Sequence, residues 1–397
     1  MIWDTDVTVI GAGAAGLSLA IGIAKPLPAG RRAPRATVVD APPGPLRPPG
    51  RTWCYWESGV GPYDGLLTAS WNRLRLYAPD GTVIDRPLGT MRYKMLRSDR
   101  FEAAMLERLG GYGVEVRQMT VESAHDAGGQ AVVHGHEASG ASSLIRSGLV
   151  FDSRPPRRLP TARTTLLQHF QGWFVRTARP AFDPDAATLM DFRLPQPPGG
   201  LAFGYVLPLN EYEALVEYTQ FSRATLDGAS YNQALRHYCT SVLRLGDYTV
   251  REREQGVIPM SDGVYPRRRG HRIFFIGAAG GATRPSTGYT FSAIQRQSRH
   301  LAEAVRAGRS PARVPAIHGR RARAMDAVLL RALDTGRVDG AALFAHLFSV
   351  VPAERVLRFL DGATSPLEDF GIGLRTPVMP MLRSLVELPL LRRSVPA

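Results

Sequence analysis

The feature that most constrains this chain is a glycine-rich turn near its beginning. Residues 11–16 read GAGAAG, a G-x-G-x-x-G pattern. The apolar run at 7–10 predicts a buried parallel strand before it, and residues 14–24, rich in Ala, Leu and Ile, predict a helix after it. Residues 36–40 predict a second strand, reached through a right-handed crossover. This order of elements is typical of a dinucleotide-binding fold.

Each position of the turn has its own expected role. Gly11 permits the tight turn, Gly13 lets the backbone approach a diphosphate, and Gly16 lets the helix pack close to the strand. The diphosphate would lie at the helix N-terminus, where the N–H groups around Ala14 and Ala15 have no partner. The alternative is a glycine-rich turn that holds no ligand.

Three charged residues are candidates for the ribose and phosphate side of the same cofactor. Asp40 ends the second strand and would accept hydrogen bonds from a ribose. Asp152 ends an apolar strand expected at 149–152 and would approach the adenosine. Arg100 belongs to a helix expected at 97–109, with Ser98 or Asp99 as its cap, and would reach a ribose or phosphate. An ordinary surface arginine is the alternative for Arg100.

A second glycine cluster favours FAD over NAD as the dinucleotide. Residues 277–281 read GAAGG and follow a strand expected at 272–276. Flavoproteins return to the cofactor with such a segment, and the helix expected from about 286 would direct its positive end at the flavin ring. A purely structural glycine turn is the alternative. The cofactor candidates here are Gly277, Gly280, Gly281, Thr287 and Gly288.

The remaining pattern predicts a β-rich part followed by helices. Residues 114–138 resemble hairpin material, and the runs at 201–207 and 212–222 suit a second hairpin. We expect an α/β fold of the glutathione-reductase-like flavoprotein kind. Its parts would be a Rossmann-type FAD-binding domain at 1–165 and 250–310, a β-rich substrate domain at 50–100 and 166–249, and a helical C-terminal region at 311–397.

The charge of the chain invites an anionic partner without identifying it. The formal net charge is +14, and Lys25 and Lys94 are the only lysines among 49 basic residues. Such an excess can attract nucleic acid or an anionic membrane. Because the arginines are scattered and no nucleic-acid fold signature is present, we expect no nucleic acid partner. Cys54 and Cys239 lie far apart, so we expect neither a metal site nor a disulfide framework.

Several longer segments carry a family signature, in order, from about residue 4 to 370. They are residues 6–20, the stretch RTWCYWE at 51–57, FGYVLP at 203–208 with ALVEYTQFS at 214–222, IGAAGGATRPSTGYTF at 276–291, and Phe359-Leu360-Asp361. Together they resemble the bacterial lycopene β-cyclases, which are FAD-dependent carotenoid enzymes. The resemblance implies an isomerase that closes β-ionone rings on lycopene or a related acyclic carotene, with reduced FAD as cofactor and NAD(P)H as its reductant.

Ring closure on an alkene needs a strong acid that stays protonated in an apolar pocket. Glu217 lies on the strand expected at 212–222 and shares a face with Leu215, Thr219 and Phe221. Burial disfavours the charged form of a carboxyl group, so such a residue can hold its proton. The resemblance implies that Glu217 is the acid–base group. The alternative is a glutamate paired with an arginine at a sheet edge.

Other side chains are candidates for supporting the reaction. Further carboxylates are Asp191, Glu57 and Asp361. Aromatic rings could line the polyene tunnel and stabilise cations, although core packing is the alternative for each of them. These rings are Trp53, Tyr55, Trp56, Phe203, Tyr205 and Tyr289.

The hydropathy and charge of the chain bear on where the protein is located. No run reaches the ~18 apolar residues of a spanning helix, and the start, with Asp4 and Asp6, does not resemble a secretory leader. The segment 374–393 mixes leucines with arginines, so we expect a cytoplasmic protein attached peripherally to the cell membrane; packing of this segment on the core is the alternative.

The rival functions are a flavin-dependent redox enzyme (a monooxygenase, halogenase or isoprenoid reductase) and a basic binding protein.

Overall fold

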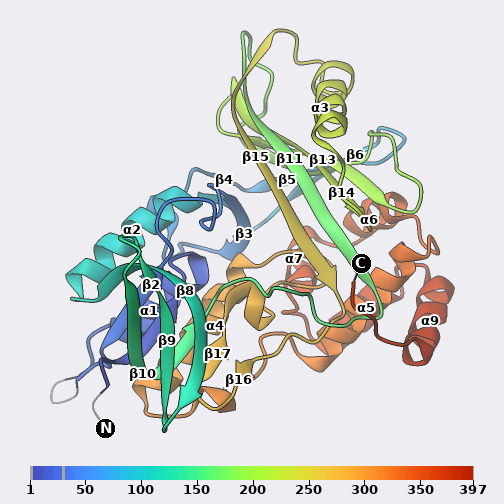
Figure 1. The fold of residues 1–397 in the computed structure, drawn as a ribbon. Helices are drawn as coiled ribbons and strands as arrows, with labels where there is room; N and C mark the ends of the chain where they lie inside the picture. The colour runs from blue at the N-terminus through green and yellow to red at the C-terminus, as the bar shows by residue number, and fades with distance from the viewer. Residues whose placement is uncertain (1–2, 29–31, 397) are drawn as a thin grey trace.

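The computed structural model describes residues 3–28 and 32–396 (Figure 1). The chain begins in a parallel sheet, at the lower left of Figure 1. Strand β1 (Thr5–Ile10) lies between β2 (Ala36–Asp40) and the end of β10 (Ser142–Asp152), and β17 (Ile273–Phe275) runs parallel on the far side of β10. Helix α1 (Ala14–Ala24) connects β1 to β2, with the bounds that the sequence predicts. Residues 29–31 of the following loop lie outside the described residues.

An antiparallel meander extends this sheet, and helices cover it. Strand β8 (Glu115–Ala127) pairs with β2 at its start and with β9 (Gln130–Glu137) beyond it, and β9 pairs with β10. Helices α2 (Ser98–Gly111) and α4 (Phe291–Arg306) pack against α1. The short β16 (Arg268–Arg269) pairs with β17. This architecture confirms the predicted α/β, Rossmann-type fold.

A second, mainly antiparallel sheet runs across the upper part of Figure 1 in the order β15-β11-β14-β13-β12-β5-β6. The hairpin of β13 and β14 is paired as the sequence predicts. In contrast to its neighbours, β12 runs parallel to β5. The bounds are β5 (Arg73–Tyr77), β6 (Val83–Pro87), β11 (Thr165–Thr177), β12 (Ala186–Asp191), β13 (Leu201–Pro208), β14 (Glu213–Ser222) and β15 (Tyr248–Ser261).

Strand β15 bears on the boundary between the two expected domains. It pairs with β11 along almost its whole length, whereas the expected division assigned residues from 250 onward to the FAD-binding part. A highly charged strand gives no local sign of which sheet it joins. We therefore propose that residues up to 261 belong with the β-rich part.

Helices pack on both faces of the second sheet. Helix α3 (Gly228–His237), which the sequence did not reveal, packs on one face, where Tyr231 and Leu235 meet Trp173 and Val216. The other face meets the C-terminal helices through Phe203, Leu215 and Phe221. These helices are α5 (Arg320–Asp334), α6 (Gly340–Val350), α7 (Ala353–Leu360), α8 (Pro366–Gly373) and α9 (Val378–Glu387).

A small third sheet lies between the two large ones. It consists of β3 (Thr52–Ser58), β7 (Met91–Arg97) and β4 (Ala69–Trp71), in the order β3-β7-β4. Its apolar side chains divide between two cores: Trp56 and Tyr93 join the core of the second sheet, and Tyr55 and Leu96 join that of the first. The small sheet therefore fixes the two large sheets relative to each other.

Two helix starts differ from expectation. Helix α2 has Arg97 at its N-cap position without a side-chain cap, and the Ser98 hydroxyl instead accepts a hydrogen bond from the Arg51 N–H at 2.9 Å. The helix expected from about residue 286 starts at Phe291. The reason is local: Gly288 has φ +70°, outside the helical region, and its N–H bonds to the Arg284 carbonyl.

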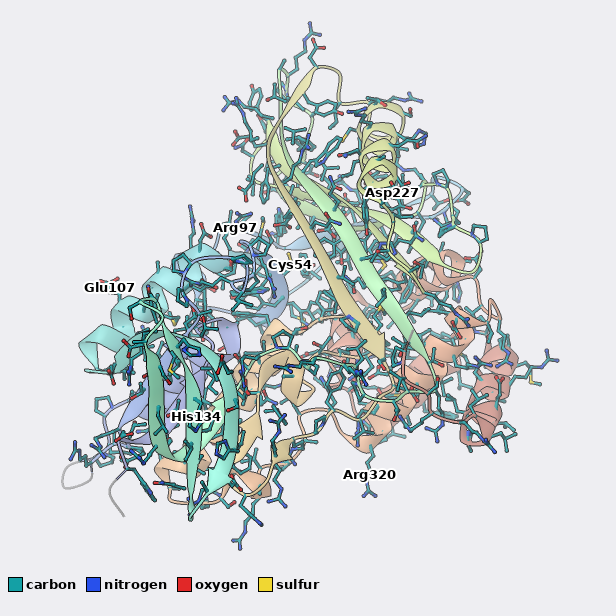
Figure 2. The ribbon with its side chains drawn as sticks, in the orientation of Figure 1. Cys54, Arg97, Glu107, His134, Asp227 and Arg320 are labelled. Carbon is teal, nitrogen blue, oxygen red and sulfur yellow. The ribbon has the colours of Figure 1, made fainter. Side chains whose placement is uncertain are left out.

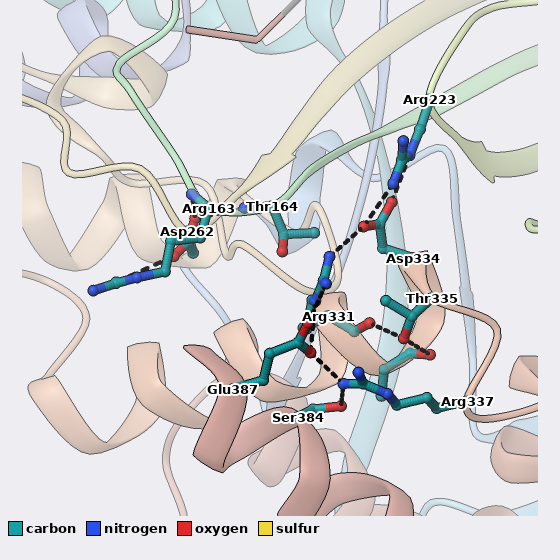
Figure 3. Close-up of polar contacts among 11 residues, drawn as sticks. Arg163, Thr164, Arg223, Asp262, Arg331, Asp334, Thr335, Arg337, Ser384 and Glu387 are labelled. Atoms are coloured by element: carbon teal, nitrogen blue, oxygen red, sulfur yellow. Dashed lines mark hydrogen bonds and ion pairs between the residues drawn. The ribbon is translucent and has the colours of Figure 1, made fainter. Parts of the chain in front are cut away.

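The C-terminal helices are held together by ion pairs (Figure 3). Arg331 on α5 and Arg337 in the connection after α5 both contact Glu387 at the end of α9. Arg331 also contacts Asp334. Arg223, which follows β14, reaches Asp334 as well. The region is mostly helical, as predicted. No helix among the described residues combines the length and apolar composition that crossing a bilayer requires.

The glycine turn yields a test of the fold. A Cβ at Gly16 would lie 1.8 Å from the Gly11 carbonyl oxygen, whereas a Cβ at Gly13 has no atom within 4 Å. We expect Gly16→Ala to lower the free energy of unfolding by about 3 kcal/mol, because backbone atoms must move apart. Gly13→Ala is the control and should stay within about 0.5 kcal/mol of the wild type. Urea unfolding of the apoprotein measures both; equal stabilities would contradict this packing.

Candidate active site

The glycine turn has the geometry that each predicted role requires. Gly11 has φ +96°, and a Cβ there would lie 2.2 Å from the Ser153 hydroxyl oxygen. Gly16 touches the turn itself, so α1 packs closely on β1. Space is open beside Gly13, at the start of α1, where an anion would meet unpaired N–H groups. The turn thus fits a dinucleotide diphosphate.

The second glycine cluster lies against the first. A Cβ at Gly277 would lie 2.8 Å from the Ala15 Cβ, and Gly277 has φ +62°. A Cβ at Gly280 would lie 2.3 Å from the Phe275 carbonyl oxygen, and Gly281 has φ +76°. Two segments far apart in the sequence therefore meet at one edge of the parallel sheet.

Among the charged cofactor candidates, Asp40 and Asp152 lie at this edge. Asp40 accepts a hydrogen bond from the Ala12 N–H at 3.0 Å, and Asp152 ends the strand beside Ile10. Asp152 is paired with Arg154, at 2.7 Å between Nη2 and Oδ2. The exposed side chain of Arg100, on α2, donates a hydrogen bond to the Leu67 carbonyl at 3.4 Å, and its contact with a cofactor stays a prediction.

The loop after the second cluster holds an unsatisfied polar atom. The Thr287 hydroxyl is buried and has no hydrogen-bond partner, which a bound polar ligand could supply. Gly288 lies against Gln168 of β11. The loop is fixed by Arg284, which is buried and pairs with the buried Asp326 of α5 at 2.9 Å. The C-terminal helices therefore help to shape this part of the site.

Two cavities lie next to this loop, and most of the predicted aromatic side chains line them. One cavity, of about 210 Å³ when the adjoining open solvent is included, is lined by Tyr55, Trp56, Tyr289 and Cys54 among others. The other, of about 300 Å³ on the same basis, is lined by Phe203, Tyr205, Tyr289 and Thr287 among others. Trp53 lines neither, because its ring packs between Phe101 and Phe291.

Glu217 lies in the middle of the second sheet, on the face that turns toward the cavities. It shares this face with Leu215 and Phe221, as predicted, and Tyr205 is its direct neighbour on β13. Its side chain is half-buried and accepts a hydrogen bond from the Thr219 hydroxyl at 2.5 Å. Among the described residues Glu217 has no ion pair, so the sheet-edge salt bridge is not what the structure contains.

The surroundings of Glu217 favour its protonated form. Burial, together with the nearby carboxyl group of Glu254, raises the pKa of Glu217 to about 8, and the hydrogen bond from Thr219 opposes this only in part. Glu217 lines neither cavity itself. Its neighbour Tyr205 lines the larger one. Tyr289 lines both cavities, and its hydroxyl lies 3.1 Å from the Tyr205 hydroxyl.

The other carboxylate candidates are engaged by cations. Asp191 is fully buried and bound by Arg193 at 2.5 Å and by the Tyr238 hydroxyl, toward α3. Glu57 accepts a hydrogen bond from the buried Lys94 at 2.9 Å. Asp361 borders the smaller cavity and is paired with Arg296 at 2.5 Å. Each of these three carboxyl groups has a cation partner, and Glu217 is the one of the four for which no ion pair is found among the described residues.

Sequence reasoning missed several groups near Glu217. The most important is Glu254 on β15, whose carboxylate accepts a hydrogen bond from the Thr52 hydroxyl at 2.7 Å and lies 3.5 Å from Arg97. Figure 2 labels Arg97 and Cys54, which lie where the small sheet approaches β11 and β15. Tyr93, whose hydroxyl lies 3.4 Å from that of Tyr289, was also missed.

Solved structures share this architecture at low sequence identity. A geranylgeranyl bacteriochlorophyll reductase-like protein from Thermoplasma acidophilum aligns with a TM-score of 0.64 at 13% identity, over 97% of this chain and 99% of that one. A p-nitrophenol 4-monooxygenase from Pseudomonas putida aligns with a TM-score of 0.60 at 16% identity, over 97% of both chains. A halogenase in complex with FAD aligns with a TM-score of 0.61 at 14% identity, over 97% and 94%.

Comparison of the sequence itself gives a narrower result. No curated protein matches the chain. The family model described as lycopene cyclase protein matches residues 6–386, which is nearly the whole sequence. The glycine turn, the strand that carries Glu217 and the C-terminal helices α5 to α8 lie within this match, and α9 extends one residue beyond it. The chain therefore belongs to the lycopene cyclase family.

Proposed function

We propose that this protein is a lycopene β-cyclase, an isomerase that converts the linear ψ-ends of lycopene or a related acyclic carotene into β-ionone rings. The observation that carries the proposal is Glu217: an acid whose pKa is raised to about 8 stands without a cation beside an aromatic-lined cavity. Membership of the lycopene cyclase family supports the same substrate class.

The proposed cofactor is FAD in its reduced form, with NAD(P)H as the reductant. Residues at the edge of the parallel sheet fit a dinucleotide, and Thr287 offers a free hydroxyl. When bound and reduced, FAD supplies an electron-rich ring that stabilises nearby positive charge. The residues proposed to hold it are Gly11, Gly13, Ala14, Ala15, Gly16, Asp40, Asp152, Gly277, Gly280, Gly281, Thr287 and Gly288.

Glu217 would transfer the proton in both directions. Its carboxylic acid donates a proton to a carbon of the terminal alkene, which leaves a tertiary cation in the substrate. The neighbouring double bond attacks this cation and forms the ring bond, so the positive charge moves into the ring. The carboxylate of Glu217 then takes a proton from the ring and restores the acid. No electron is gained or lost, and the product is an isomer of the substrate.

Aromatic faces would stabilise the cations while water is excluded. Tyr205 and Tyr289 line the larger cavity, and the Trp56 ring lies 4.5 Å from that of Tyr289 in an edge-on arrangement. The negative face of an aromatic ring attracts a cation, and the attraction grows when the pair is desolvated.

We also propose that the C-terminal helices bind an anionic bilayer, from which the carotene would come. Helices α8 and α9 and the short segments that follow them expose many apolar side chains. Arg375 and Arg383 lie among these residues in the sequence, and Arg392 follows them. A basic and apolar surface of this kind suits the membrane interface. The apolar residues are Leu367, Phe370, Leu374, Met379, Leu382, Leu385, Val386 and Leu390, with Leu367 84% and Leu390 80% exposed.

The first test is made in bacteria that accumulate lycopene. The wild-type protein should convert lycopene into cyclic carotenes of unchanged mass, and Glu217→Gln should abolish this conversion because an amide cannot donate the proton. The control is Glu213→Gln at the other end of β14, whose exposed pair with Arg176 makes no contact with the cavities. Product analysis by chromatography and mass spectrometry measures the outcome.

Two results would contradict this proposal: an active Glu217→Gln variant, or unchanged lycopene with folded, flavin-loaded wild-type protein. Consumption of NAD(P)H in proportion to product would instead support the flavin-dependent redox alternative.

The activity should also depend on pH in a defined direction. Because Glu217 must be protonated, and its pKa is raised to about 8, the rate should be constant below this pH and fall tenfold per unit above it. Initial rates with reduced flavin in micelles, between pH 6 and pH 10, measure the profile. A rate that rises through this range would exclude Glu217 as the acid.

Membrane binding can be tested with vesicles that contain anionic lipid. The double variant Leu374→Ser and Leu390→Ser should reduce co-flotation with these vesicles at least tenfold, because it removes apolar area from the proposed surface. The control is Leu46→Ser with Val60→Ser, two exposed side chains near the N-terminal sheets, which should leave flotation unchanged. Equal flotation of both double variants would disprove the assignment of the surface.

A further inference from the structure

A row of residues crosses the second sheet beside Glu217. In the register of the strands, Tyr205 on β13 lies opposite Glu217 on β14, Glu217 lies opposite Gly172 on β11, and Gly172 lies opposite Glu254 on β15. Residues that are directly opposite point to the same face of a sheet. Two glutamates therefore stand on this face with a single glycine between them.

The glycine allows the two carboxyl side chains to face each other. A Cβ at Gly172 would lie 2.8 Å from the Leu215 Cδ1, 3.3 Å from the Glu254 Cγ and 3.7 Å from the Glu217 Cβ. The apolar Leu215 side chain therefore lies over the glycine, next to both acids. A larger side chain at position 172 would displace Leu215 and push the two glutamates apart, so the glycine lets both acids and the leucine share this face.

The two glutamates differ in their partners. Glu254 accepts a hydrogen bond from Thr52 at 2.7 Å and lies 3.5 Å from the Arg97 guanidinium, which also stacks 4.7 Å from the Phe174 ring. Glu217 receives one hydrogen bond, from Thr219. Burial raises the pKa of both carboxyl groups. For Glu254 the Thr52 hydroxyl and the Arg97 cation both oppose this rise, whereas for Glu217 only the Thr219 hydroxyl does, so Glu254 is the glutamate of the two that has a cation to stabilise its charge.

We propose that Glu254 is a positioning residue for the acid–base group: its carboxylate, fixed by Thr52 and Arg97, faces Glu217 across Gly172 and keeps the proton on Glu217. This inference rests on the proposed function of Glu217 and adds a second residue to it. Two negative charges on neighbouring positions of one covered sheet face cannot both be present without cost, so the carboxyl group that lacks a cation holds the proton.

The other titratable groups around Glu217 carry no charge near neutral pH. Burial raises the pKa of Tyr205, of Tyr93 and of the Cys54 thiol, and raises the pKa of Tyr289 to about 12. Arg97 is the nearby cation, and it is directed to Glu254 and to Glu252. Among the described residues, Glu254 is thus the negative charge that acts on Glu217.

The arrangement would serve both halves of the reaction. Before the reaction, the charge on Glu254 holds Glu217 protonated, ready to donate. After donation, two carboxylates face each other, and their repulsion makes Glu217 a stronger base for removing the proton from the ring. Glu254 itself exchanges no proton with the substrate, so its effect appears in the affinity of Glu217 for its proton.

The test follows the Glu217 carboxyl group directly and needs no carotene. Infrared difference spectra across pH 5 to 10 record the C=O stretch of protonated carboxylic acids in the folded, flavin-loaded protein, and subtraction of Glu217→Gln assigns the band of Glu217. Glu254→Gln should move the midpoint of this band to lower pH by about 1 unit, because the opposing charge is gone while the hydrogen bond with Thr52 can remain.

Two further variants control this measurement. Glu254→Asp keeps the charge and should leave the midpoint closer to the wild-type value than Glu254→Gln does. Glu252→Gln also removes a partner of Arg97, but its residue lies opposite Phe174 and is half exposed, so the midpoint should not move. An unmoved midpoint in Glu254→Gln, or an equal shift in Glu252→Gln, would overturn the inference.

The same variants separate this inference from the proposed function. If the protein cyclises carotenes, the falling limb of its pH profile should move with the infrared midpoint in Glu254→Gln. Loss of activity at every pH without a shift of the limb would mean a merely structural role and would also overturn the inference. Absence of cyclase activity in the wild type would refute the proposed function alone, because the infrared midpoints would still be measurable.

Discussion

A carboxyl group on the covered face of a sheet must either find a cation or give up its charge, and Glu217 has no cation partner in the part of the chain that the structure describes. Moving an ionised carboxylate out of water without a partner is costly, so the group keeps its proton. The chain meets the same problem differently elsewhere: Asp191 and Asp326 are at least as deeply buried, and each is bound by an arginine. The contrast separates structural carboxylates from the one that the reaction would use.

The small sheet between the two large ones allows this environment to form. It contributes Thr52 and Arg97 to the second glutamate, Tyr93 to the tyrosine hydroxyls, and Tyr55 and Trp56 to the smaller cavity. None of these side chains belongs to the dinucleotide-binding unit or to the long sheet. The candidate site is therefore a product of three sheets, and no one of them could supply it alone.

Local sequence patterns predicted the features that depend on residues close together in the chain. The glycine turn, α1 and β2 were predictable because their residues lie close together, and the alternation along β14 placed Glu217, Leu215 and Phe221 on one face. Glu254 was not predictable, since Arg251, Glu252 and Arg253 around it make the strand resemble an exposed one. Only its pairing with β11 reveals that Glu254 turns inward. No short segment of the sequence specifies the register between strands that are far apart in the chain.

The buried pair of Arg284 and Asp326 links two regions that the proposed function treats separately. Arg284 begins the loop that carries Thr287 and Tyr289, whereas Asp326 lies on α5, to which α9 is attached through Glu387. Separating the two side chains would leave each charge buried without a partner or solvent, which is costly. The loop and the helix therefore stay together. A displacement of α9 would thus be passed through α5 and the Arg284–Asp326 pair to the loop that borders the candidate site.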